Sequence, residues 1–184
     1  GVVENNARLR LGESIVVLGA GGIGLNIVQA ASLVSAYPII AVDLHENRLD
    51  LARQMGATHL VNASEDDVQA KLEPITGSEG VDVAVDNTGL PEMIQLGYRI
   101  TKPTGRVVLV GVPRIGDDIE LHSLPLHFGK QLSGSHGGNG DPHADIPRYH
   151  GLYRSGRIRL RELITDVVGL DDINDAIRKM RAGE

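Results

Sequence analysis

Between Ser14 and Gly111, short apolar runs alternate with helix-length stretches that are amphipathic. The runs are apolar almost throughout, a pattern typical of parallel strands that are covered on both faces. We expect strands at Ser14–Gly19, Pro38–Asp43, His59–Val61, Val81–Asp86 and Arg106–Val110. We expect helices at Gly22–Ala36, Glu46–Met55, Ser64–Glu73 and Pro91–Ile100. This alternation predicts a doubly wound α/β fold, a parallel sheet of about six strands in the order 3-2-1-4-5-6 with helices on both faces.

The pattern changes after Gly111, where Gly, Pro, His and Ser become frequent. Here the expected elements are strands at Asp118–Leu121, Lys130–Ser135 and Thr165–Val168, and helices at Ala144–Tyr153 and Asp171–Arg181. The last helix carries apolar residues at i, i+3, i+4 and i+7, namely Ile173, Ala176, Ile177 and Met180. Helix boundaries are also marked. Ser64 followed by Asp67 resembles a capping box, Pro91 fits a first helical turn, and Gly56 fits just past a helix end.

Composition limits the classes of function. The chain has 184 residues, 41% of them hydrophobic, and a formal net charge of −6. That length suits one compact domain or slightly more, and the acidic balance disfavours binding to nucleic acid or to an anionic membrane. No apolar run approaches the roughly 20 residues that span a bilayer. Cysteine is absent, which removes disulfides, thiol nucleophiles and thiolate zinc ligands. We expect a cytoplasmic protein.

A glycine cluster follows the first predicted strand, in SIVVLGAGGIG. Gly19, Gly21 and Gly24 form G-x-G-x-x-G between a strand and a helix, where a tight turn and the helix N-terminus accept a pyrophosphate. Asp43 ends the next predicted strand, where a carboxylate can accept both hydroxyls of an adenosine ribose. The same charge would repel a 2′-phosphate, so the pattern favours NAD over NADP. Arg48, one helical turn beyond Asp43, could pair with a 2′-phosphate, but we expect it to lie along the ribose or to make a surface ion pair.

An ordered series of segments carries a resemblance to a known family: LGESIVVLGAGGIG, IIAVDLHENRLDLARQMGATHLVN, GVDVAVDNTG and PTGRVVLVGVP. Together they resemble the coenzyme domain of the medium-chain dehydrogenases/reductases, of the zinc-dependent alcohol dehydrogenase type. The resemblance implies that the pyrophosphate lies on Gly19, Gly21, Gly22, Ile23 and Gly24, and the adenosine ribose on Asp43 and Arg48. It implies that Thr88 lies beside the coenzyme. It further implies that Val110, Gly111 and Val112 line the nicotinamide side, with Ser135, His136 and Gly137 at the carboxamide.

The resemblance also implies what the parent enzyme does. In this family an N-terminal catalytic domain supplies the zinc ligands, and hydride passes between an alcohol or polyol and nicotinamide. We expect residues 1–184 to be the dinucleotide-binding domain, with 136–184 leading back toward an absent catalytic domain. Such a fragment is expected to bind NAD but to hold no zinc and to catalyse nothing. Family members often pair through the sheet edge, which makes Asp118–Leu121 a candidate homodimer contact.

Two alternatives stay open. One is the coenzyme domain of a zinc-free quinone or enoyl reductase of the same family, an enzyme type that usually takes NADPH. The other is a non-catalytic module that senses NAD. A preference for NADPH would favour the first alternative, and a zinc-ligand segment fused ahead of Gly1 in the gene would rule out the second.

Other candidate sites have simpler explanations. Tyr98 and Lys102 show the Y-x-x-x-K spacing of short-chain dehydrogenases, yet they end a helix just before a turn and a strand. Five histidines and two aspartates crowd one region without metal-ligand spacing: His122, His127, His136, Asp141, His143, Asp145 and His150. Four arginines alternate without aromatic partners, which is typical of a solvated edge and not of a nucleic-acid site: Arg154, Arg157, Arg159 and Arg161.

Overall fold

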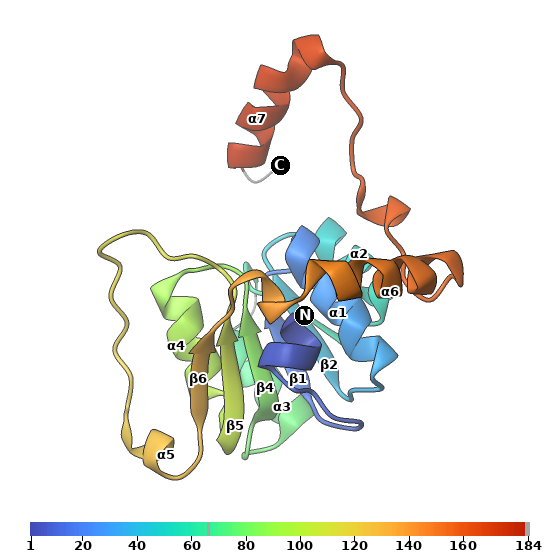
Figure 1. The fold of residues 1–184 in the computed structure, drawn as a ribbon. Helices are drawn as coiled ribbons and strands as arrows, with labels where there is room; N and C mark the ends of the chain where they lie inside the picture. Colours follow the sequence, from blue (N-terminus) through green and yellow to red (C-terminus); the bar gives the residue numbers. More distant parts are fainter. Residues whose placement is uncertain (66, 183–184) are drawn as a thin grey trace.

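The computed structural model describes residues 1–65 and 67–182, which form a parallel six-stranded sheet flanked by helices (Figure 1). The strands are β1 (Ile15–Leu18), β2 (Ile39–Asp43), β3 (His59–Asn62), β4 (Val81–Asp86), β5 (Thr101–Leu109) and β6 (Gln131–Gly134). They lie in the order β3-β2-β1-β4-β5-β6, all parallel. The predicted fold class and strand order are therefore confirmed.

The helices follow the same alternation. They are α1 (Gly22–Leu33), α2 (Glu46–Met55), α3 (Val68–Thr76), α4 (Pro91–Arg99), α5 (Leu124–His127), α6 (Pro142–Arg154) and α7 (Ile173–Ala182). Shorter helical turns cover Val2–Asn6, Gly137–Asn139, Arg161–Leu163 and Leu170–Asp172. The helical turn Val2–Asn6 and α5 were not expected from the sequence, and β5 begins at Thr101 instead of Arg106.

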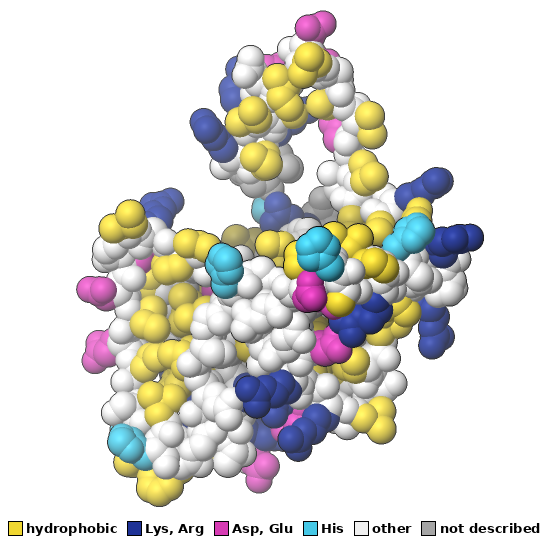
Figure 2. Space-filling view, in the orientation of Figure 1, with side chains coloured by type: hydrophobic (Ala, Val, Ile, Leu, Met, Phe, Trp, Pro, Cys, Tyr) yellow, Lys and Arg dark blue, Asp and Glu magenta, His cyan; other side chains and the backbone are white. Residues whose placement is uncertain are grey.

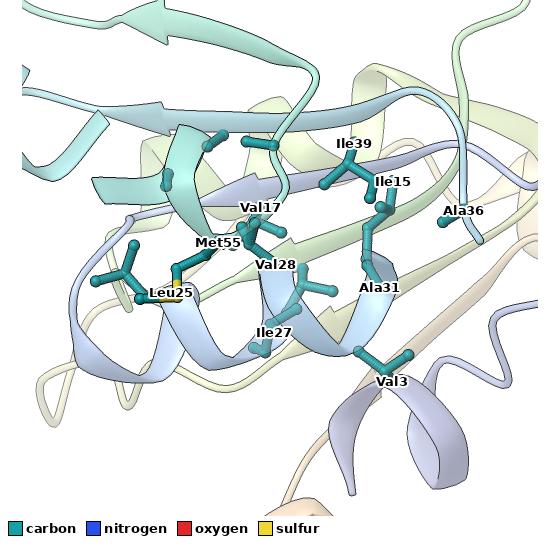
Figure 3. Close-up of a cluster of buried hydrophobic side chains, with 14 of the residues drawn as sticks. Val3, Ile15, Val17, Leu25, Ile27, Val28, Ala31, Ala36, Ile39 and Met55 are labelled. Carbon is teal, nitrogen blue, oxygen red and sulfur yellow. The ribbon is translucent and has the colours of Figure 1, made fainter. Parts of the chain in front are cut away.

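Each strand contributes to two separate cores because successive side chains point to opposite faces of the sheet. Val17 packs with α1 and α2, whereas its neighbour Leu18 packs with α3 and α4. Figure 3 shows the first of these cores, in which Val28 of α1 lies against Val17 of β1. Because both faces are covered, the strands read as continuous apolar runs, with all four residues of β1 buried.

The helix ends confirm two of the three predicted boundary signals. Gly56 follows α2 with φ +113°, a conformation that favours glycine, and Pro91 occupies the first turn of α4. The third signal was wrong. Asp67 is itself the N-cap of α3 and accepts a hydrogen bond from the Ala70 N–H at 3.2 Å. The helix expected at Ser64–Glu73 therefore begins at Val68; that predicted range also includes residue 66, which lies outside the described residues.

Two of the expected strands are also corrected. Residues 118–121 and 165–168 are described, but neither segment pairs with the sheet, whose edge on that side is β6. Apolar and β-branched residues favour extended backbone, but a strand requires a neighbour that supplies the ladder of hydrogen bonds. These segments find no such neighbour within the described part of the chain.

The C-terminal part of the chain leaves the sheet. The α6 helix remains attached, because Arg148 makes two hydrogen bonds to Glu4, at 3.0 and 2.8 Å. Beyond it, α7 stands apart from the rest of the molecule (Figure 1), and hydrophobic side chains gather on this projecting part (Figure 2). We expect residues 136–184 to lead toward another domain. The last two residues of that range, 183–184, lie outside the described residues. Among the described helices, none combines the length and apolar character needed to cross a bilayer.

Candidate dinucleotide-binding site

The glycine cluster forms the turn between β1 and α1. Gly19 has φ +91°, which favours glycine, and a Cβ on Gly24 would lie 2.0 Å from the Gly19 carbonyl oxygen. A Cβ on Gly21 or Gly22 would meet nothing within 4 Å. Two of the glycines therefore permit the turn itself, and two leave open space over it. The first turn of α1 presents backbone N–H groups and the positive end of the helix dipole at this point.

Asp43 joins the end of β2 to this turn. Its Oδ2 accepts a hydrogen bond from the Ala20 N–H at 2.8 Å, and its Oδ1 accepts one from the His45 N–H at 3.0 Å. The Arg48 Nη1 lies 3.6 Å from Oδ1, and the Asp43 side chain is only 6% exposed. Each carboxylate oxygen can accept more than one hydrogen bond, so the group keeps acceptor capacity toward a ligand.

A cleft of about 590 Å³ opens over these groups. Eight of the predicted site residues line it: Gly19, Gly21, Gly22, Ile23, Gly24, Asp43, Arg48 and Thr88. The other lining residues were not identified from the sequence, namely Val42, Leu44, His45, Ala63, Val68, Asn87, Leu90, Glu92 and Met93. Most of them follow the carboxyl ends of β2, β3 and β4, the edge at which open α/β sheets bind ligands. The positions that follow each predicted strand were therefore the available signal.

At the end of β4, the side chains of Asp86 and Thr88 are committed to the local turn. The Asp86 Oδ1 accepts hydrogen bonds from the Thr88 hydroxyl at 2.6 Å and from the Thr88 N–H at 3.1 Å, and its Oδ2 accepts one from the Gly89 N–H at 3.0 Å. The Thr88 hydroxyl in turn accepts the Leu90 N–H at 3.1 Å. Thr88 thus lines the cleft, but its only hydroxyl proton is donated to Asp86.

Asn87 lies between them and faces the glycine turn. Its backbone N–H donates to the Leu18 carbonyl at 2.8 Å, and its Nδ2 lies 3.4 Å from the Gly19 carbonyl oxygen. Its Oδ1 is buried and has no hydrogen-bond partner. Asn87 is not among the site residues predicted from the sequence, because an Asn-Thr-Gly turn after a strand does not reveal which side chain lacks a partner.

The remaining predicted residues lie at the same edge of the sheet but outside the lining of this cleft. Val110, Gly111 and Val112 follow β5, and Ser135, His136 and Gly137 follow β6. A Cβ on Gly111 would lie 2.2 Å from the Gly89 nitrogen, so this turn packs tightly against the one after β4.

Several polar groups of these two segments have partners within the fold. The Val110 and Gly111 N–H groups both donate to the Asp86 carbonyl, at 2.8 and 3.0 Å. The Ser135 N–H donates to the Leu109 carbonyl at 2.8 Å, and its hydroxyl donates to the Asn6 Oδ1 at 2.9 Å. The three backbone N–H groups just named and the Ser135 hydroxyl are therefore committed to bonds within the fold.

The described residues do not fit a zinc ion. In residues 1–65 and 67–182, no group of three or more His, Cys, Asp or Glu side chains is arranged to hold a metal. The histidines of the 122–150 region therefore do not assemble into a ligand set. The glycine turn, with its open space and the adjacent carboxylate, does fit a dinucleotide.

Comparison with known proteins places the chain in a family. The family model described as "Zinc-binding dehydrogenase" matches residues 22–153. The chain belongs to the zinc-binding dehydrogenase family. It is 33% identical over 192 residues to the class-3 alcohol dehydrogenase of Cereibacter sphaeroides, and 31% identical over 191 residues to the S-(hydroxymethyl)glutathione dehydrogenase of Paracoccus denitrificans. All of this chain is covered in both cases, but only 51% of each relative, so the chain spans about half the length of these relatives.

Solved structures agree with the fold. An alcohol dehydrogenase zinc-binding domain protein from Burkholderia ambifaria superimposes with a TM-score of 0.92 at 35% identity, over 99% of this chain and 49% of that one. Benzyl alcohol dehydrogenase from Acinetobacter calcoaceticus superimposes with a TM-score of 0.92 at 34% identity, over 99% of this chain and 50% of that one. A zinc-binding dehydrogenase from Sinorhizobium meliloti, solved bound to NADP, superimposes with a TM-score of 0.82 at 30% identity, over 94% of this chain and 50% of that one. The chain therefore corresponds to the coenzyme-binding half of this family.

Proposed function

We propose that this chain binds NAD(H) in the cleft at the carboxyl edge of the sheet, as the coenzyme domain of a zinc-type alcohol dehydrogenase. One observation carries the proposal. A nearly buried carboxylate, Asp43, is fixed by the Ala20 N–H beside a glycine turn that opens into the same cleft. The turn accommodates the pyrophosphate, and the carboxylate accepts the ribose hydroxyls.

The charge at Asp43 supports NAD over NADP. A 2′-phosphate at that ribose would lie against a carboxylate, and like charges brought together in a partly desolvated site cost several kcal/mol. The Arg48 Nη1 lies 3.6 Å from the Asp43 Oδ1, so the negative charge of the carboxylate is partly balanced. The NADP-bound relative from Sinorhizobium meliloti makes coenzyme preference the first property to measure.

The whole enzyme is proposed to transfer hydride between an alcohol or polyol and the nicotinamide of the bound coenzyme. Similarity to proteins named as alcohol dehydrogenases supports this assignment. Because the described residues do not fit zinc, we assign the metal to a domain that this chain does not contain, and expect no turnover from the chain alone. The exposed apolar side chains after α6, including Ile164 and Val167, support contact of residues 136–184 with that domain.

A homodimer through the sheet edge is part of the same proposal. Of the two edge strands, β3 and β6, the one on the side of residues 118–121 is β6, and an unpaired edge offers N–H and C=O groups to a second copy. Residues 118–121 are described without a sheet partner, so pairing with their own copy would supply the missing ladder. Sedimentation equilibrium decides between the monomer and the dimer.

The cofactor proposal is tested by titrating the chain with NADH and NADPH side by side, following nicotinamide fluorescence. We expect NADH to bind at least about tenfold more tightly, and Asp43→Gly to remove the difference. Equal affinity of the unaltered chain for the two coenzymes would show that the assignment of Asp43 is wrong. Tighter binding of NADPH would favour a zinc-free reductase of the same family.

A further inference from the structure

The polar side chains at the end of β4, Asp86, Asn87 and Thr88, divide into two kinds. Asp86 and Thr88 bond to each other and to the backbone of their own turn, and the only hydroxyl proton of Thr88 goes to Asp86. Asn87, between them, lines the cleft and keeps a buried Oδ1 without a partner. The group available for a ligand at this strand end is therefore the Asn87 carboxamide and not the Thr88 hydroxyl.

The orientation of that carboxamide follows from its surroundings. Nδ2 faces the Gly19 carbonyl oxygen at 3.4 Å, and exchanging the two amide atoms would place one acceptor against another. Oδ1 is thus the unpaired atom. A buried acceptor without a donor destabilises a fold, and native proteins leave few of them, so an unpaired group beside a ligand cleft calls for a donor from the ligand.

The strand order indicates which part of a dinucleotide supplies the donor. The glycine turn follows β1, which lies between β2, carrying Asp43, and β4, followed by Asn87. A dinucleotide has one ribose on each side of its pyrophosphate. With the pyrophosphate on the turn and the first ribose at Asp43, the second ribose reaches the β4 side. Phosphate oxygens only accept hydrogen bonds, whereas ribose hydroxyls also donate them.

We infer that Asn87 is a cofactor-binding residue whose Oδ1 accepts a hydrogen bond from a hydroxyl of the second ribose, the one that carries nicotinamide. This inference rests on the proposed function. Oδ1 is covered before binding, so the carboxamide must turn toward the cleft. Its Nδ2 contact to Gly19 is long for a hydrogen bond, so turning it sacrifices little. The residue then holds the nicotinamide half in register with the glycine turn.

The test uses three probes on the whole chain: ADP, which lacks the second ribose, ADP-ribose, which contains it, and NADH. We expect Asn87→Ala to weaken the binding of ADP-ribose and of NADH by about three- to tenfold, measured by calorimetry, and to leave ADP binding unchanged. Asp43→Asn serves as the comparison, because it touches the ribose common to all three probes and should weaken them all. Asn87→Leu keeps the side-chain volume, and it replaces Asn87→Ala if circular dichroism shows that the smaller variant is unfolded.

Three results would overturn the inference. Equal weakening of ADP and ADP-ribose would mean that Asn87 acts only by supporting the Gly19 turn. Unchanged affinity for all probes would mean that Oδ1 makes no bond to the ligand. Failure of the unaltered chain to bind NADH would instead refute the proposed function on which the inference rests. This result is distinct from the first two because it is measured on the unaltered chain, without any substitution.

Discussion

The Asp43 carboxylate accepts a hydrogen bond from the Ala20 N–H at 2.8 Å, which ties the end of β2 to the glycine turn after β1. The residue proposed to bind the ribose therefore also holds the turn proposed to bind the pyrophosphate. Its second oxygen accepts a hydrogen bond from the His45 N–H, just before α2. One side chain therefore stabilises both the β1–α1 turn and the β2–α2 turn. Substitution of Asp43 should consequently affect stability as well as coenzyme affinity.

Asp43→Ala is expected to lower the free energy of unfolding by about 1–3 kcal/mol in the absence of any coenzyme, because two N–H groups lose a charged acceptor. Urea unfolding followed by circular dichroism measures the change. Asp50→Ala is the matched control, since Asp50 is an exposed carboxylate on the neighbouring helix α2. Equal stability of the two variants would contradict a bracing role for Asp43.

Two glycines of the turn should respond differently to the same substitution. Gly24→Ala places a Cβ 2.0 Å from the Gly19 carbonyl oxygen, so the helix must move away from the strand, at a cost of about 1–3 kcal/mol in the free energy of unfolding. Gly21→Ala places its Cβ in open space over the cleft, and Gly21 has an extended backbone that alanine also adopts. Thermal unfolding should therefore separate the two variants clearly.

The same two variants, Gly21→Ala and Gly24→Ala, should also differ in how their affinity for NADH relates to their stability. Gly21→Ala should fold as the unaltered chain does, yet bind NADH more weakly, because the added methyl group occupies space assigned to the pyrophosphate. A Gly21→Ala variant with unchanged NADH affinity, measured by fluorescence titration, would place the pyrophosphate elsewhere. Because Gly24→Ala disturbs the turn itself, its loss of affinity is expected to accompany a loss of stability.

Sequence patterns predicted the sheet well because its signals are local. A buried parallel strand such as β1 is apolar at every position, and the glycines and the carboxylate lie at strand ends that the pattern already marks. Residues 118–121 alternate polar and apolar side chains, and 165–168 contain three β-branched residues, so both resemble strands locally. Only the folded chain reveals whether a neighbouring strand exists.

The missed residues depend on contacts between distant parts of the chain. The unpaired Oδ1 of Asn87 is recognisable only when Gly19 lies opposite it. Lys130 is a similar case: it is nearly buried, and its ammonium donates to the carbonyls of Tyr98 and Thr101 and lies 4.4 Å from the centre of the Tyr98 ring. Burial lowers the pKa of Lys130. No local pattern distinguishes it from a surface lysine.

At the opposite end of the sheet from the cleft, Asp82 links three elements. Its Oδ2 accepts hydrogen bonds from the Ser14 N–H at 2.9 Å and hydroxyl at 2.7 Å, and its Oδ1 accepts one from the Lys102 ammonium at 2.7 Å. Burial alone would raise the pKa of Asp82, but the hydrogen bonds from Lys102 and Ser14 outweigh it and hold the pKa below its ordinary value of 3.8. The folded state therefore binds this proton more weakly than the unfolded state does.

The sign of the pH dependence follows from that difference. Asp82 stabilises the fold fully above pH 3.8, and the contribution is lost as the pH falls through the lower pKa of the folded state. Asp82→Asn should cost about 1–3 kcal/mol of unfolding free energy at neutral pH, and the gap to the unaltered chain should narrow below pH 3.8. Urea unfolding between neutral and acid pH measures the gap, with Asp50→Asn as an exposed control. A difference in unfolding free energy that stays constant into the acid range would show that Lys102 and Ser14 do not stabilise the charged form of the Asp82 carboxylate.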